Sequence, residues 1–162
     1  MIPAHGICIS SDYREILGII ILITSRIGYA QLSVSALNQQ HAWSKTNFLD
    51  SISAGNLFQV LKNDELITGY YIASFASDEC ELLNITVSKH LHRQGFGKTM
   101  ISHLIKKCIE RKTSNLFLEV RRSNKNAILL YEKKGFNEVG IRPNYYKTSD
   151  GNEDAILMAL SL

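Results

Sequence analysis

The chain reads Arg93-Gln94-Gly95-Phe96-Gly97-Lys98 at the junction between a strand-like run and an amphipathic helix. Glycines let the backbone of such a loop approach a ligand closely, and the free amides at the start of the helix carry partial positive charge. With two added cations, the loop favours a phosphate or pyrophosphate, although an ordinary strand-to-helix turn also uses glycines this way. The spacing matches neither the Walker phosphate loop nor the three-glycine dinucleotide fingerprint.

The segments around this loop alternate between strand and helix periods. Residues 57–61, 66–76 and 81–87 are rich in aromatic and β-branched side chains and joined by short turns, which predicts an antiparallel meander. Residues 97–112 carry apolar side chains at helical spacing. We also expect strands at 27–30, 116–120, 136–146 and 155–160, and helices at 33–40, from Ser44 to Ala54 with Gly55 as its stop, and from the cap Asn124 to Lys134 before Gly135. This order predicts a mixed α/β sheet with one parallel step across the helix at 97–112.

Length and composition fit one soluble globular domain. The 162 residues are 45% hydrophobic and 20% charged, which excludes a disordered chain and a disulfide miniprotein. Three scattered cysteines form no C-x-x-C pair, which favours the reducing cytoplasm and argues against zinc. Residues 89–147 hold 14 of the 18 Lys and Arg but 4 of the 15 Asp and Glu, a net charge of +10. This asymmetry indicates an anionic ligand or a set of solvated helix faces.

The first 26 residues precede the recognisable pattern. The apolar run at 17–23 is bounded by Arg14, Glu15 and Arg26, so it is too short to span a membrane. A secretory signal is not expected either, because acidic residues precede the run. An extra strand, a docked tail and a misassigned start codon all remain open for this extension. Residues 27–162 are expected to form a single domain.

Further motifs follow the loop. They are Leu118-Glu119-Val120-Arg121, Ser123-Asn124, Leu130-Tyr131-Glu132, Gly135-Phe136, Asn144-Tyr145-Tyr146 and Asp150-Gly151-Asn152-Glu153-Asp154-Ala155. Together with the loop, they resemble the GNAT acetyltransferases, in particular the ribosomal-protein-alanine (RimI) branch. The resemblance is dense over 81–162 and loose over 27–80. It implies the GNAT fold, which has a mainly antiparallel sheet, one parallel splayed pair and helices on both faces.

The resemblance also implies a cofactor site for acetyl-CoA, with no metal. The backbone of Ile85, Thr86 and Val87 would pair with the pantetheine amides like an added strand, and side chains there would be mostly core. The amides of Arg93, Gln94, Gly95, Phe96, Gly97 and Lys98 would hold the pyrophosphate, with charge from the two cations. Asn124 matches a cofactor-contacting position, and it is equally suited to cap the helix that follows.

Two residues carry the chemistry that the resemblance implies. Glu119 matches the general base that takes a proton from the α-amine, whose pKa is near 8, although an ion pair with Arg121 or another base would also explain it. Tyr131 matches the general acid that protonates the departing thiolate, whereas an isolated helix tyrosine is more often core.

The acceptor implied by the resemblance is the N-terminal alanine of the eighteenth small-subunit ribosomal protein. Residues 40–44 are shorter than the usual RimI loop, which leaves open another N-terminus, a lysine or a small amine. A non-catalytic module whose basic stretch binds RNA is the alternative from another class, but it leaves Glu119 and Tyr131 unexplained. We expect no direct nucleic-acid contact and no membrane. His90 and His92 are expected in a surface loop, and Trp43 and Phe48 are expected to pack the helical segment.

Overall fold

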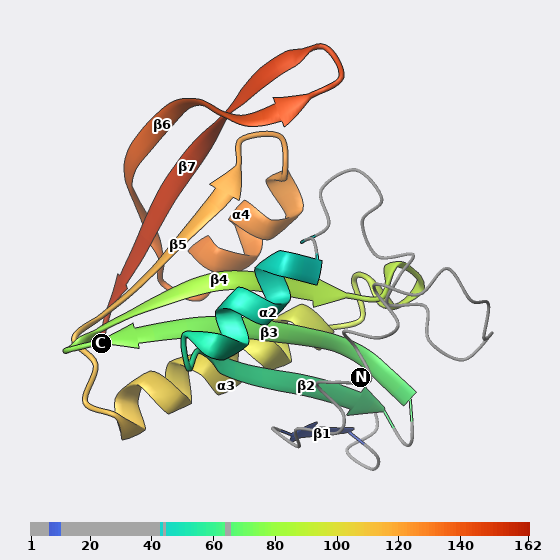
Figure 1. Ribbon diagram of the computed structural model, residues 1–162, viewed down its shortest axis with the longest axis vertical. Coiled ribbons are helices and arrows are strands. Elements are labelled where there is room, and N and C mark those ends of the chain that lie inside the picture. The colour runs from blue at the N-terminus through green and yellow to red at the C-terminus, as the bar shows by residue number, and fades with distance from the viewer. Residues whose placement is uncertain (1–6, 11–42, 44, 64–65) are drawn as a thin grey trace. The chain divides into compact units, whose positions relative to one another are not determined.

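The computed structural model describes residues 7–10, 43, 45–63 and 66–162 (Figure 1). The strands are β1 (Ile7–Ser10), β2 (Leu57–Asn63), β3 (Leu66–Ala76), β4 (Glu79–Val87), β5 (Asn115–Arg121), β6 (Asn137–Thr148) and β7 (Gly151–Ser161). The helices are α2 (Lys45–Ser53), α3 (Phe96–Glu110), α4 (Lys125–Glu132) and the short 3-10 helix η1 (Lys89–Leu91). Contacts divide the chain into a first unit, residues 1–74 and 84–100, and a second unit, residues 75–83 and 101–162.

Seven strands form one sheet in the order β1-β2-β3-β4-β5-β7-β6. The β1–β2, β2–β3, β5–β7 and β6–β7 pairs are antiparallel, whereas β4 and β5 run parallel. Parallel neighbours need a crossover connection, and α3 provides it. The expected mixed sheet with one parallel step is therefore confirmed.

The parallel ladder between β4 and β5 is short. It begins with Glu79 opposite Asn115 and ends with Leu82 opposite Leu118, although β4 itself continues to Val87. A ladder that ends midway along β4 agrees with the splayed pair that the resemblance predicts.

The core of the first unit is aromatic. Phe48 of α2 is 1% exposed, and its ring lies 5.4 Å from that of Trp43 and 5.7 Å from that of Tyr70. The predicted packing role of Trp43 and Phe48 is thereby confirmed. Gly69 of β3 has no space for a side chain, because a Cβ atom there would lie 2.5 Å from the carbonyl oxygen of Thr86. Sequence patterns gave no sign of this close approach.

The core of the second unit is aliphatic at its centre. Its fully buried side chains include those of Leu104, Cys108, Leu116, Leu118 and Met158. Helix α4 ends at Glu132, two residues earlier than predicted, because the amide of Lys134 bonds the carbonyl of Tyr131 in a tighter turn before Gly135. Gly135 has a φ of 92°, so its predicted role as the helix stop is confirmed.

The β6–β7 hairpin is longer than its sequence predicted (Figure 1). Pairing continues through Tyr146 opposite Glu153 and Thr148 opposite Gly151. These additional residues are polar and mostly exposed. Backbone pairing therefore extends the strands beyond the part that apolar periodicity marks.

Several expectations concern the N-terminal part of the chain. The strand at 27–30, the helix at 33–40, the apolar run at 17–23 and the cap Ser44 lie outside the described residues. Within the extension, β1 pairs with β2, so an extra strand is present at that point. In the part of the chain that the structure describes, no helix is long and apolar enough to cross a membrane.

Candidate active site

The glycine loop of the first unit is held by its own polar contacts. The His92 ring nitrogen Nε2 lies 2.9 Å from the Val87 carbonyl oxygen, and the Gln94 side chain donates a 3.0 Å hydrogen bond to the His90 carbonyl. Gly95 has a φ of 92°, and Arg93 has a φ of 65° although it is not a glycine. These contacts support the conformation of the loop, and because the Gln94 side chain is hydrogen-bonded to His90, its contribution to a ligand would come from the backbone amide.

Helix α3 begins at the end of this loop. Phe96 is 3% exposed and anchors the first turn, while the side chains of Arg93 and Lys98 are exposed. A helix N-terminus flanked by two cations can bind an anion through backbone amides. His90 and His92 are exposed as well, so their predicted surface position is confirmed, although His90 lies in η1 and not in a loop.

The end of β4 precedes this loop in the same unit. Ile85, Thr86 and Val87 are partly exposed, so the expectation that their side chains are mostly core is wrong. The Thr86 hydroxyl donates a 3.0 Å hydrogen bond to the Asn84 side chain. Burial raises the pKa of Tyr70 to about 12, and a hydrogen bond with Thr86 partly opposes that rise.

Glu119 lies on β5 in the second unit. Its carboxylate is 3.1 Å from Nε of Arg142 on β6, with 17% of the Glu119 side chain and 54% of the Arg142 side chain exposed. Tyr145 also forms a hydrogen bond with Glu119. The predicted ion pair with Arg121 is therefore wrong, because the basic partner of Glu119 is Arg142. The role of Glu119 as a general base stays a prediction.

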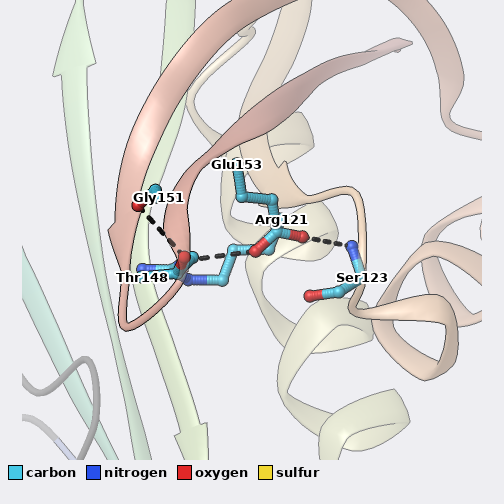
Figure 2. Close-up of polar contacts among 5 residues, drawn as sticks. All are labelled: Arg121, Ser123, Thr148, Gly151 and Glu153. Atoms are coloured by element: carbon cyan, nitrogen blue, oxygen red, sulfur yellow. Dashed lines mark hydrogen bonds and ion pairs between the residues drawn. The ribbon is translucent and has the colours of Figure 1, made fainter.

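Arg121 does not pair with Glu119, because the side chains of Tyr146 and Glu153 contact its guanidinium instead. Residues 119 and 121 lie on the same face of β5, because side chains alternate along a strand. The Arg121 guanidinium stacks 4.1 Å from the centre of the Tyr146 ring and is 3.2 Å from the Glu153 carboxylate. Figure 2 shows Glu153 between Arg121 and the Ser123 amide, to which it is also hydrogen-bonded. In the same view, the Thr148 hydroxyl donates a hydrogen bond to the Gly151 carbonyl across the β6–β7 turn, and the distance is 3.0 Å.

We refer to these side chains as the tyrosine–arginine cluster. It consists of Glu119, Arg121, Arg142, Tyr145, Tyr146 and Glu153, contributed by β5, β6 and β7. Burial raises the pKa of Tyr146 to about 12, and the nearby Glu119 carboxylate adds to that rise. Burial and then Glu119 likewise raise the pKa of Tyr145. Besides Glu119, sequence reasoning gave a role only to Arg121, as a possible ion-pair partner, although the N-Y-Y and D-G-x-E-D-A motifs include Tyr145, Tyr146 and Glu153.

Tyr131 is a residue of α4, and its side chain is buried within the second unit. It is 5% exposed, and its ring centre is 5.7 Å from that of Phe136. Burial raises the pKa of its hydroxyl, with a smaller contribution from Tyr146. The hydroxyl therefore keeps its proton at neutral pH, as a proton donor requires.

Asn124 caps the helix that carries Tyr131. Its side-chain oxygen accepts a 3.2 Å hydrogen bond from the amide of Ala127, so its predicted capping role is confirmed. Its contact with cofactor stays a prediction. Within the described ranges, no three His, Cys, Asp or Glu side chains are grouped as a metal site would require.

Comparison with known proteins identifies the protein family. The acetyltransferase (GNAT) family matches residues 26–136. The chain belongs to this family, and it is an N-acetyltransferase with the GNAT fold.

Three individual proteins are similar to this chain in sequence or structure. The chain is 44% identical over 121 residues to the [ribosomal protein bS18]-alanine N-acetyltransferase of Escherichia coli, covering 74% of this chain and 81% of that protein. The crystal structure of the Escherichia coli ribosomal-protein-S18-alanine N-acetyltransferase superposes with a TM-score of 0.81 at 35% identity, covering 96% of this chain and 93% of that one. A GNAT acetyltransferase from Elizabethkingia anophelis, solved with acetyl-CoA bound, shares the fold at 20% identity with a TM-score of 0.72, covering 98% and 99%.

Proposed function

We propose that the protein transfers the acetyl group of acetyl-CoA to the N-terminal alanine of ribosomal protein bS18. The observation that carries this proposal is the 44% identity to the Escherichia coli enzyme named for that reaction, which extends over most of both chains. The presence of an acetyl-CoA-bound relative of the same fold supports the choice of donor.

The glycine loop would bind the donor through its diphosphate. Backbone amides from Arg93 to Lys98 are suited to phosphate oxygens, because the first turn of the helix presents free amides and positive partial charge. Arg93 and Lys98 would add charge-assisted contacts. The β4–β5 ladder ends at Leu82, which supports the proposal that the backbone of Ile85, Thr86 and Val87 pairs with the pantetheine amides.

Glu119 would act as the general base. The α-amine of a peptide has a pKa near 8, so a single proton must leave before its nitrogen attacks the thioester carbonyl. The carboxylate of Glu119 accepts that proton while Arg142 and Tyr145 hold it in place. As the new amide bond forms, the carbon–sulfur bond breaks and the sulfur leaves as a thiolate.

Tyr131 would supply the proton for that thiolate. Its buried hydroxyl is protonated at neutral pH, and donation to sulfur yields free CoA. The second proton that the nitrogen loses as it becomes an amide restores the tyrosine hydroxyl, and Glu119 releases its own proton to solvent. Asn124 caps the start of α4 and would also contact the cofactor. No step in this scheme needs a metal.

The proposal includes a cytoplasmic location. Cys80 and Cys108 are free and buried, as expected of a protein in a reducing compartment. No direct contact with nucleic acid or membrane is part of the proposal.

A thiol-release assay with acetyl-CoA and a panel of peptides tests this function. The panel contains a peptide that begins with alanine followed by arginine, the same peptide with a blocked N-terminus, and a peptide whose only free amine is a lysine. We expect release with the first alone, and mass spectrometry should locate the acetyl group on its α-amine. Acetylation of the lysine peptide alone would assign a different acceptor, and no release with any peptide would contradict the proposal.

Binding of the donor can be measured separately. A ligand that binds the folded state raises the melting temperature by mass action. Acetyl-CoA should raise it more than ATP or NAD at equal concentration. Equal stabilisation by ATP would indicate a general phosphate site.

A further inference from the structure

The D-G-x-E-D-A motif places two adjacent carboxylates at the start of β7, and their surroundings differ. Asp154 lies 3.3 Å from Arg122, whose side chain is 48% exposed. Glu153 lies 3.2 Å from Arg121, and these two side chains are only 18% and 16% exposed. A sheltered ion pair loses hydration, so it persists only when its hydrogen bonds are well formed. The Glu153 pair therefore constrains geometry more than its neighbour does.

One set of contacts leads from Glu153 through Arg121 to the tyrosines. The guanidinium that Glu153 holds is the one that stacks 4.1 Å above the Tyr146 ring. A planar guanidinium fixed by a carboxylate gives an aromatic ring one preferred orientation. Tyr146 in turn is the neighbour that adds to the raised pKa of Tyr131.

A second set of contacts leads from Glu153 through the backbone. Its other carboxylate oxygen accepts a hydrogen bond from the Ser123 amide (Figure 2). Ser123 directly precedes Asn124, the cap of α4, and Tyr131 lies in that same helix. The hydrogen bonds from Ser123, followed by the ion pair with Arg121, also lower the pKa of Glu153. Glu153 thus stays ionised and joins β7 both to the end of β5 and to the entry of α4.

We infer that Glu153 is a positioning residue for Tyr131: it fixes the Tyr146 ring through Arg121 and the start of α4 through Ser123. Glu153 takes no part in proton transfer itself. This inference rests on the proposed function, because it assigns Glu153 an effect on the proton donor of that reaction.

A double-mutant cycle tests the inference. Glu153→Gln keeps the shape of the side chain and loses its charge, so kcat should fall by about 10- to 100-fold, which is the usual effect of a small misplacement of a catalytic group. The Kd for acetyl-CoA should stay unchanged. In a Tyr131→Phe background, the same substitution should cause no further loss, because Glu153 acts through the hydroxyl that is already missing. A purely structural role would reduce the rate in both backgrounds.

Arg122→Gln serves as the matched control, because it breaks the adjacent and more exposed ion pair. Its kcat should stay within about twofold of the parent. The melting temperature of each variant shows whether it is folded. If Glu153→Gln does not fold, Arg121→Lys keeps the positive charge, loses the planar stack on Tyr146, and should show the same loss of kcat and the same lack of additivity.

The outcomes separate the two proposals. An active parent whose Glu153→Gln variant keeps its kcat, or loses the same factor with and without the Tyr131 hydroxyl, overturns the positioning role alone. A parent that releases no thiol with any acceptor contradicts the proposed function, and the inference falls with it.

Discussion

The glycine loop at 93–98 and the tyrosine–arginine cluster are built in different ways. The loop uses mainly backbone groups, with two residues at positive φ and side chains that bond nearby carbonyls. The cluster uses side chains from three strands, which are far apart in sequence and are brought together by strand register. The proposed role of the loop therefore depends on local backbone conformation, whereas the proposed role of the cluster depends on contacts between side chains of different strands.

This difference predicts how each region responds to substitution. A change in the loop should alter the affinity for acetyl-CoA and spare the chemical step. A change in the cluster should alter the chemical step and spare acetyl-CoA affinity. The following variants test that division.

The largest effect is expected for Glu119→Gln. Removing a general base should lower kcat by about 10²- to 10⁴-fold near neutral pH. The loss should shrink as the pH rises through the pKa of the α-amine, near 8, because the amine then deprotonates unaided. The rate of thiol release measured from pH 6.5 to 9 checks this. Glu138→Gln, on the exposed part of β6, is the matched control. A defect that ignores pH and follows a loss of stability would make Glu119 only the ion-pair partner of Arg142.

A smaller effect is expected for Arg93→Glu. Charge-assisted hydrogen bonds are worth about 1.5–3 kcal/mol, so the Kd for acetyl-CoA should rise by about 10- to 100-fold. Calorimetry measures this directly. Lys106→Glu reverses a charge whose side chain is 74% exposed on α3, outside the loop, and it should leave the Kd near the parental value. An unchanged Kd in Arg93→Glu would make the loop an ordinary turn.

Two glycines that follow helices allow a comparison of stability. Gly55 has a φ of 74° and nothing within 4 Å of an added Cβ, whereas a Cβ on Gly135 would lie 3.2 Å from Cδ1 of Leu160. A residue with a side chain costs about 1–2 kcal/mol in the left-handed region, so both alanine variants should lose stability. Gly135→Ala should lose more, because Leu160 must also move. Urea unfolding of both variants measures the difference, and equal losses would mean that Leu160 adjusts freely.

The smallest effect concerns His103 of α3. Burial and then the charge of Lys107 lower its pKa in the folded state. Protonation therefore favours the unfolded chain, whose histidine has a pKa near 6.5, and this contribution to stability is lost as the pH falls below that value. In His103→Gln, the free energy of unfolding should change less between pH 7.5 and 5.5 than in the parent. Urea titrations at the two pH values test this, and identical pH dependence in both proteins would contradict it.

The two regions also differ in how far sequence predicted them. The sequence alone predicts a turn at Gly95 and Gly97 and a helix after it, because local conformation restricts which residues a turn accepts. The strands and their one parallel step were readable from periodicity. The sequence marks Glu119 as an unusual carboxylate in an apolar strand, but it does not identify Arg142 as the ion-pair partner. Arg121 is near in sequence and Arg142 is distant, and only the register through β7 selects between them.

Other features had no local signal. The tight contact at Gly69 depends on Thr86, seventeen positions away along the chain. The stacking of Arg121 on Tyr146 depends on the length of the β6–β7 hairpin, which polar residues extend beyond the apolar pattern. Such contacts form between residues that are far apart in the sequence, so hydrophobic periodicity does not predict them.

Tyr131→Phe tests the central claim most directly, because it removes one hydroxyl and keeps the buried ring. The measurement is single-turnover acetyl transfer to the alanine peptide, together with the Kd for acetyl-CoA. The account predicts a rate about 10²- to 10⁴-fold below the parent with an unchanged Kd. A near-normal rate would contradict the role of Tyr131 as the proton donor, and a slow rate that accompanies weakened acetyl-CoA binding would contradict the separation of the chemical step from acetyl-CoA binding.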